Sequence, residues 1–230
     1  MRSLFADNRA RLRTFVLCTV TAVSYGLASP RMHWHILCWF LLVPFLEALE
    51  GKDARGAFSV GWLTGTLIHL ICFTWVIGTV QRYSNLNLAL SVLAWVLFSV
   101  YSGVAFGAMA SVYRFLTARL VLPGIAVLPI SYAAMEFLYP FIFPWHLGAG
   151  LYGVVPVIQI SDLFGVYGVT ALVVLVNHAC WDLLRFVQKK TAFPVLSFVL
   201  AVLFLFCTLA YGVWRVRTLE TIRAEAERFT

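Results

Sequence analysis

One segment of the chain differs from its neighbours: FPWHLGAGLYGVVPVIQISDLFGVYG, residues 143–168. It holds two prolines and five glycines in 26 residues, so it cannot run as one helix. Yet the chain carries no Lys, Arg, Asp or Glu between Glu136 and Asp162. The segment therefore combines an interrupted backbone with the composition of a buried one.

The composition around this segment indicates a membrane protein. Of the 230 residues, 62% are apolar and 12% are charged, whereas a soluble domain is about a quarter charged. A helix needs roughly 20 apolar residues to cross a bilayer, and backbone groups in lipid must pair within their own segment. We therefore predict an all-α polytopic membrane bundle of about seven transmembrane helices, from apolar blocks near residues 14–29, 32–46, 57–79, 87–112, 121–140, 157–184 and 193–214.

The first two blocks are short. They are typical of a helical hairpin that turns at Ser29-Pro30-Arg31, because a helix usually ends before a proline. Alternatively, the first block is a cleaved signal peptide, since a basic stretch precedes it and small residues follow. We favour the hairpin, because cleavage would leave the second block without a partner.

The basic residues predict the orientation. If the gaps alternate between the two sides, eleven Lys and Arg residues fall inside, only Arg31 and Arg82 fall in outside loops, and four arginines follow Trp214. The positive-inside rule then predicts a cytoplasmic N-terminus and an extracytoplasmic C-terminus, although the four arginines of the tail mildly oppose it. The expected organisation is a transmembrane domain, residues 1–214, and a short polar extracytoplasmic tail, residues 215–230. The net charge of +7 is thus topological, and no nucleic-acid partner is expected.

Prolines 144 and 156 bracket the segment quoted above. Irregular backbone at membrane depth is tolerated only where protein or water covers it. We therefore predict an outer-face loop near residues 140–156 that is inserted into the bundle, with Trp145 at the headgroup level. Asp162 follows at an expected helix start, where its carboxylate fits an N-cap.

Several polar or small residues lie inside the apolar blocks. His178 and Asp182 share a helix face and are predicted to pair, whereas Cys180 points elsewhere. Glycines four apart, at 61 and 65 and again at 103 and 107, indicate either a specific helix contact or ordinary glycine use, and the two remain equally good. No spacing suggests a cofactor or metal site, because His33-Trp-His35 lacks a third ligand. The cysteines are interpreted as small buried hydrophobic residues: Cys18, Cys38, Cys72, Cys180 and Cys207.

Three motifs carry a resemblance to a known family. Phe143-Pro-Trp-His-Leu-Gly148 is followed by Pro156-Val-Ile-Gln-Ile-Ser-Asp-Leu-Phe-Gly-Val-Tyr-Gly-Val169 and then by Leu175-Val-Asn177. Together they resemble the membrane region of apolipoprotein N-acyltransferase. The resemblance begins near residue 40, and Ser161 is a mild departure, since the family commonly has Ala there. It implies structural or lipid-facing roles, with no catalytic role, for Glu136, Phe143, Pro144, Trp145, Pro156, Gln159, Asp162, Gly165, Gly168 and Asn177.

The resemblance also implies what lies outside this sequence. Proteins of the family continue into an extracytoplasmic nitrilase-like domain with a Glu–Lys–Cys triad, and this sequence stops where that domain would begin. The expected function is the lipid-binding membrane part of a lipoprotein N-acylation system in the bacterial inner membrane, inactive by itself. Its expected partners are phospholipid, lipoprotein and a nitrilase-like domain that is encoded separately or missing. The alternatives are a non-enzymatic scaffold or truncated relic, and a transporter, which the lack of an inverted repeat disfavours.

Overall fold

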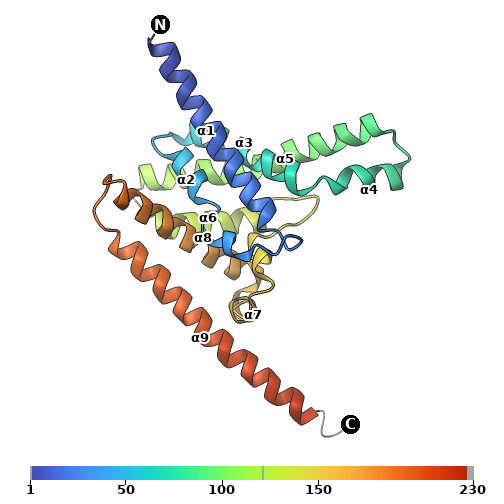
Figure 1. Ribbon diagram of the computed structural model, residues 1–230, viewed down its shortest axis with the longest axis vertical. Coiled ribbons are helices and arrows are strands. Elements are labelled where there is room, and N and C mark those ends of the chain that lie inside the picture. Colours follow the sequence, from blue (N-terminus) through green and yellow to red (C-terminus); the bar gives the residue numbers. More distant parts are fainter. Residues whose placement is uncertain (1, 121, 227–230) are drawn as a thin grey trace.

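The computed structural model describes residues 2–120 and 122–226, and within them every regular element is a helix, which confirms the all-α prediction (Figure 1). Nine α-helices and two short 3-10 helices occur in this described part. In chain order they are α1 (Arg2–Leu27), η1 (His35–Trp39), α2 (Val43–Leu49), α3 (Ala54–Cys72), α4 (Trp75–Ser84), α5 (Leu88–Arg119), α6 (Gly124–Leu138), η2 (Leu147–Leu151), α7 (Val155–Ile158), α8 (Ser161–Val187) and α9 (Val195–Ala226).

Three of these helices are long and apolar enough to cross a membrane: α5, α8 and α9 up to Arg223. Helices α3 and α4 form a fourth candidate if they are counted as one span, bent by 66° at its break. Two further apolar segments, His35–Leu49 and Gly124–Leu138, are shorter than a full span. The protein is therefore a polytopic membrane protein with three or four candidate spans among the described residues.

The second apolar block was predicted as one helix, and this prediction is wrong. Residues 32–46 form the 3-10 helix η1 and then the start of α2, with an irregular turn between them. Pro44 lies in the first turn of α2, where a missing N–H costs little, but it cannot belong to a helix interior. The hairpin turn itself follows α1 as expected, with the N–H of Met32 donating to the carbonyl of Ser29 at 3.0 Å.

The glycine pairs of the third and fourth blocks face each other where α3 crosses α5. A Cβ atom at Gly61 would overlap the carbonyl oxygen of Phe106, and one at Gly103 would overlap Thr66. A Cβ at Gly107 would lie 3.0 Å from Phe58 of α3, which is also a tight contact. Of the two interpretations, a specific helix contact is therefore correct, because the backbones approach closer than any side chain allows.

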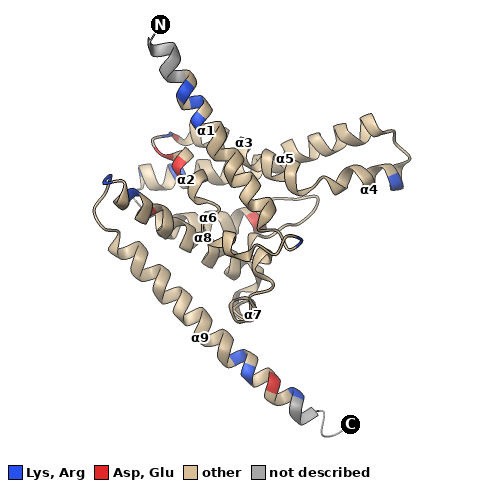
Figure 2. Cartoon of the chain, viewed as in Figure 1, with Lys and Arg blue, Asp and Glu red and all other residues tan. Residues whose placement is uncertain are grey.

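Most charged residues lie toward the ends of the helices, and few lie in the middle of the bundle (Figure 2). At one end, Glu47 of α2 accepts hydrogen bonds from Arg13 of α1 and from Lys190 in the turn after α8. Lys190 also donates to Glu50 at 2.7 Å, and these bonds to Glu50 and Glu47 raise the pKa of Lys190 above its ordinary value. Three segments with predicted inside charges thus meet at one end of the bundle.

Candidate functional site

The loop between α6 and α7 packs into the bundle. Its residues Leu147 and Leu151 are 2% and 0% exposed, although the segment has almost no regular helix. The ring of Trp145 packs edge-on against Phe73, with centroids 5.8 Å apart, and Phe143 packs against Trp75 at 5.0 Å. Pro144 is exposed between them. The aromatic rings on either side of Pro144 thus anchor the loop to the break between α3 and α4.

Glu136 of α6 holds this loop in place through hydrogen bonds. Its buried carboxylate accepts hydrogen bonds from the backbone N–H of Leu147 at 2.8 Å and from the hydroxyl of Thr170 at 2.9 Å. His146 Nδ1 lies 3.2 Å from the same carboxylate. Thr170 in turn accepts from the N–H of Gly148 at 2.9 Å. One carboxylate therefore ties α6, α8 and the loop together, and it satisfies backbone groups that the irregular segment leaves without helical partners.

Asn177 of α8 holds a second irregular segment, the break between η1 and α2. Its side-chain oxygen accepts from the N–H of Leu42, and its nitrogen donates to the carbonyl of Cys38, both at 2.7 Å. The nitrogen also donates to Val173, four residues earlier on α8. A fully buried amide thus replaces the backbone bonds that are lost where η1 gives way to α2. Glu136 and Asn177 are therefore brought to two breaks in the chain, not to one common site.

Asp162 was predicted as an N-cap, and the structure corrects this role. It lies in the first turn of α8, its side chain makes no capping bond, and Oδ2 accepts from Arg215 Nε of α9 at 2.7 Å. Gly165, three residues on, has φ +64° and ψ −172°, a conformation that only glycine adopts readily. This break separates the turn that carries Asp162 from the rest of α8. The main partner of the Asp162 carboxylate is thus a side chain of α9, not the backbone of its own helix.

The remaining motif residues shape the backbone of this region. Pro156 lies in the first turn of α7, and its carbonyl lies against Gly212 of α9, where a Cβ would overlap it. Gln159 donates to the carbonyl of Val155 within its own turn at 3.2 Å. Gly168 leaves room for the side chain of Phe164, which a Cβ would approach to 2.5 Å. These three residues support the short helices before α8 and carry no side chain suited to chemistry.

The predicted pair of His178 and Asp182 is confirmed, with Nδ1 and Oδ2 3.1 Å apart. His178 Nε2 lies 3.2 Å from the hydroxyl of Tyr113 on α5, and Asp182 accepts a hydrogen bond from Ser197 on α9. This chain of polar groups links three helices at the end of the bundle opposite Asp162. Arg185, three residues further along α8, lies with its Nε 3.2 Å from Oε1 of Glu50.

The cysteines form no site in the described residues. Cys18 and Cys38 are buried, Cys72 and Cys180 are half-buried, and Cys207 is exposed on α9. The expectation of burial is therefore wrong for Cys207, since it lies on the outward surface of an apolar helix. Within residues 2–120 and 122–226, no three His, Cys, Asp or Glu side chains are grouped closely enough to hold a metal ion.

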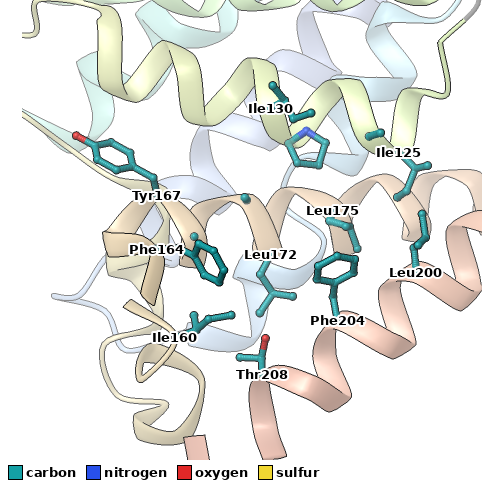
Figure 3. A pocket seen from close by; sticks show the side chains of 14 residues that line it. Ile125, Ile130, Ile160, Phe164, Tyr167, Leu172, Leu175, Leu200, Phe204 and Thr208 are labelled. Atoms are coloured by element: carbon teal, nitrogen blue, oxygen red, sulfur yellow. The ribbon is translucent and has the colours of Figure 1, made fainter. Parts of the chain in front are cut away.

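A groove opens between α6, α8 and α9 (Figure 3). Its volume is about 490 Å³, and its walls are almost entirely apolar, with Pro129, Leu172 and Phe204 among them. Gly168 is the only predicted site residue in its lining. Sequence reasoning missed the groove, because its walls come from three helices and each contributes ordinary apolar residues.

The same segments match a known family. A family model described as the apolipoprotein N-acyltransferase N-terminal domain matches residues 21–179. The chain belongs to this family. The resemblance that rests on the three motifs is thereby confirmed, and the chain is a multi-pass membrane protein of a bacterial family.

Individual relatives agree with the family match. An apolipoprotein N-acyltransferase of Geobacter metallireducens is 32% identical over 217 residues, which cover 90% of this chain and 41% of the relative. One of Bdellovibrio bacteriovorus is 30% identical over 132 residues, or 56% of this chain and 24% of the relative. One of Thermotoga maritima is 26% identical over 200 residues, or 82% and 39%. The chain therefore spans about two fifths or less of the length of these relatives.

Proposed function

We propose that this chain is the membrane, lipid-binding part of an apolipoprotein N-acyltransferase-like system. The observation that carries the proposal is that the motif segment shared with the family, residues 143–177, is also the segment that orders one end of the bundle. Glu136 and Thr170 hold its loop, and the loop packs against aromatic residues at the break between α3 and α4. A rigid, uncharged surface of this kind suits the seat of a catalytic domain that works at the membrane boundary.

The proposed arrangement in the membrane follows the charge pattern. Seven membrane segments of unequal length would place the N-terminus in the cytoplasm and the C-terminal tail outside it, in the bacterial inner membrane. The meeting of Arg13, Glu47 and Lys190 at one end supports a single cytoplasmic face. The loop that Glu136 holds would then lie at the extracytoplasmic end, where the tail also emerges.

The proposed reaction has two steps. A thiolate attacks the ester carbonyl of a phospholipid acyl chain, and a thioester and a lysophospholipid form. The amine of a diacylated N-terminal cysteine of a lipoprotein then attacks the thioester, which forms an amide and releases the thiol. In this proposal a nitrilase-like domain outside residues 1–230 supplies the nucleophile, and the present residues bind and position lipid.

The positions of the lysines support a nucleophile from outside these residues. Family chemistry needs a thiol beside an acid and a lysine, but the chain has only three lysines, Lys52, Lys189 and Lys190. Lys52 follows α2, and Lys189 and Lys190 follow α8, at the end where the inside charges meet. The loop that the catalytic domain is proposed to contact lies elsewhere. No cysteine of the described residues is therefore expected to serve as an acyl acceptor.

Two assays test the proposal. The chain is expressed in a strain depleted of its own acyltransferase, with and without a nitrilase-like domain supplied separately, and triacylated lipoprotein is measured. We expect product only when both are present, and none with either alone. In parallel, the purified chain with phospholipid and a diacylated lipopeptide should form no acyl-thioester. A thioester on any of the five cysteines would make the chain an enzyme in its own right, and no product with both parts would favour a non-enzymatic scaffold.

A further inference from the structure

The groove between α6, α8 and α9 is suited to a ligand from the membrane. Its volume of about 490 Å³ is within the usual range of ligand sites. Two residues on its edge, Ile130 and Phe164, are 70% and 64% exposed, so the groove opens sideways rather than toward the core. A groove with apolar walls and a lateral opening admits a hydrocarbon chain directly from lipid.

One polar group interrupts the apolar lining. Thr208 of α9 is 1% exposed, lines the groove, and its hydroxyl has no hydrogen-bond partner among the described residues. Other threonines of the same helix, Thr218 and Thr221, donate to the carbonyl four residues earlier. In Figure 3 the oxygen of Thr208 is turned toward Leu172 across the groove. A buried hydroxyl without a partner is costly, so an acceptor supplied by a ligand would stabilise it.

A guanidinium group lies further along α9, beyond the residues that line the groove. Arg215 follows Thr208 by seven residues, or about 10 Å along the helix, and helical side chains lean back toward the N-terminus. Its Nε donates to Asp162, which lies in the turn between two groove-lining residues, Ile160 and Phe164. A guanidinium carries five N–H donors and matches the geometry of a phosphate.

Along α9, the guanidinium of Arg215, the hydroxyl of Thr208 and the apolar groove follow the same order as the phosphate, ester and acyl chain of a phospholipid. We propose that the groove binds a diacyl glycerophospholipid, with its phosphate at Arg215, an ester carbonyl accepting from Thr208, and the attached acyl chain along the groove. The choice of a phospholipid over another amphiphile rests on the proposed function. The site itself rests on the apolar walls, the unpartnered hydroxyl of Thr208 and the guanidinium of Arg215 further along the same helix.

The first test separates the ester from the rest of the lipid. Native mass spectrometry of the purified chain measures binding of a diester phosphatidylglycerol and of its diether analogue, matched in headgroup and chain length. Thr208→Val should weaken binding of the diester about threefold to tenfold, the scale of one lost hydrogen bond, and leave the diether unchanged. Thr218→Val, which removes a hydroxyl that is already bonded within α9, should change neither. Equal effects on both lipids, or none on either, would overturn the role of Thr208.

The second test fills the groove. Leu200 lines it, whereas the adjacent Val199 is 52% exposed on the same helix. Leu200→Trp should abolish tight binding of both lipids, and Val199→Trp should retain it. Retained binding in a folded Leu200→Trp variant would show that lipid binds elsewhere or only as part of the surrounding layer. If Leu200→Trp fails to fold, the comparison of diester and diether lipids with Thr208→Val still decides the proposal.

The two proposals fail in different ways. If Leu200→Trp supports normal acylation and normal lipid binding, the groove proposal is wrong and the proposed function stands. If the wild-type chain binds the diester lipid in the groove but gives no triacylated product with a nitrilase-like domain, the proposed function is wrong and the lipid site stands.

Discussion

The side-chain oxygen of Asn177 accepts a hydrogen bond from the backbone N–H of Leu42, and the two residues are 135 positions apart. The same amide donates to Cys38, so one side chain of α8 closes both sides of the break between η1 and α2. The break is tolerated inside the bundle because a fully buried amide replaces the missing helical partners. One side chain of α8 therefore holds the junction between η1 and α2.

Asn177→Leu should destabilise the protein strongly. It leaves the N–H of Leu42 and the carbonyl of Cys38 without partners, and each buried group costs about 1–3 kcal/mol, so the free energy of unfolding should fall by about 2–6 kcal/mol. Thermal or denaturant unfolding in detergent measures the change. Gln159→Leu is the control, because Gln159 bonds only within its own turn, and it should be near neutral. Equal stability of the two variants would show that the amide is dispensable.

Glu136→Ala should release the inserted loop without unfolding the bundle. The N–H groups of Leu147 and Gly148 would lose the carboxylate and the ordered hydroxyl of Thr170. We expect amide hydrogen exchange of residues 146–151 to rise by about tenfold or more, since each lost bond corresponds to about 1–3 kcal/mol. Glu136→Gln, which retains an acceptor, should have a smaller effect, and the exposed Glu220→Gln should have none. Unchanged exchange in Glu136→Ala would contradict the role of this carboxylate.

Gly61→Ala should separate α3 from α5. Its Cβ would overlap the carbonyl oxygen of Phe106, and overpacking of this kind typically costs about 1–3 kcal/mol. Gly78→Ala is a matched control, because a Cβ at Gly78 meets nothing within 4 Å and alanine favours the helix by up to about 1 kcal/mol. The ratio of folded to aggregated protein in a detergent melt distinguishes the two. A Gly61→Ala variant as stable as Gly78→Ala would mean that the helices do not cross this closely.

The pair of Asp162 and Arg215 should contribute little to stability. Their side chains are 39% and 34% exposed, and ion pairs of that exposure are typically worth about 0.2–1 kcal/mol. A double-mutant cycle with Asp162→Asn and Arg215→Gln measures the coupling between them directly. A coupling well above 1 kcal/mol would indicate a desolvated pair, and zero coupling would show that the contact does not persist in the membrane.

The orientation has its own test. A reporter that is active only outside the cytoplasm, fused after Thr230, should be active, because the inside charges predict an extracytoplasmic tail. Residues 227–230 lie outside the described residues, so the fusion does not disturb a described contact. A second fusion after Lys190, where the inside charges meet, serves as the silent counterpart. A well-expressed but silent fusion at Thr230 would overturn the seven-segment topology.

The sequence by itself determined the class of the protein and its family. Long apolar blocks can only be helices in lipid, and the spacing of Phe143, Pro156, Asp162 and Asn177 in their motifs led to the family that the comparison then confirmed. The pair of His178 and Asp182 was also predictable, because residues four apart share a helix face.

Only the tertiary structure decided what the polar residues do. Asn177 reaches Cys38, Glu136 reaches Thr170, and Asp162 reaches Arg215, and each contact joins residues 34 or more positions apart. Local patterns carry no information on such partners, so Asp162 was assigned to its own helix and the interruption after η1 was not foreseen. The groove was hidden for the same reason: its walls are unremarkable on each helix, and its shape exists only where three helices diverge.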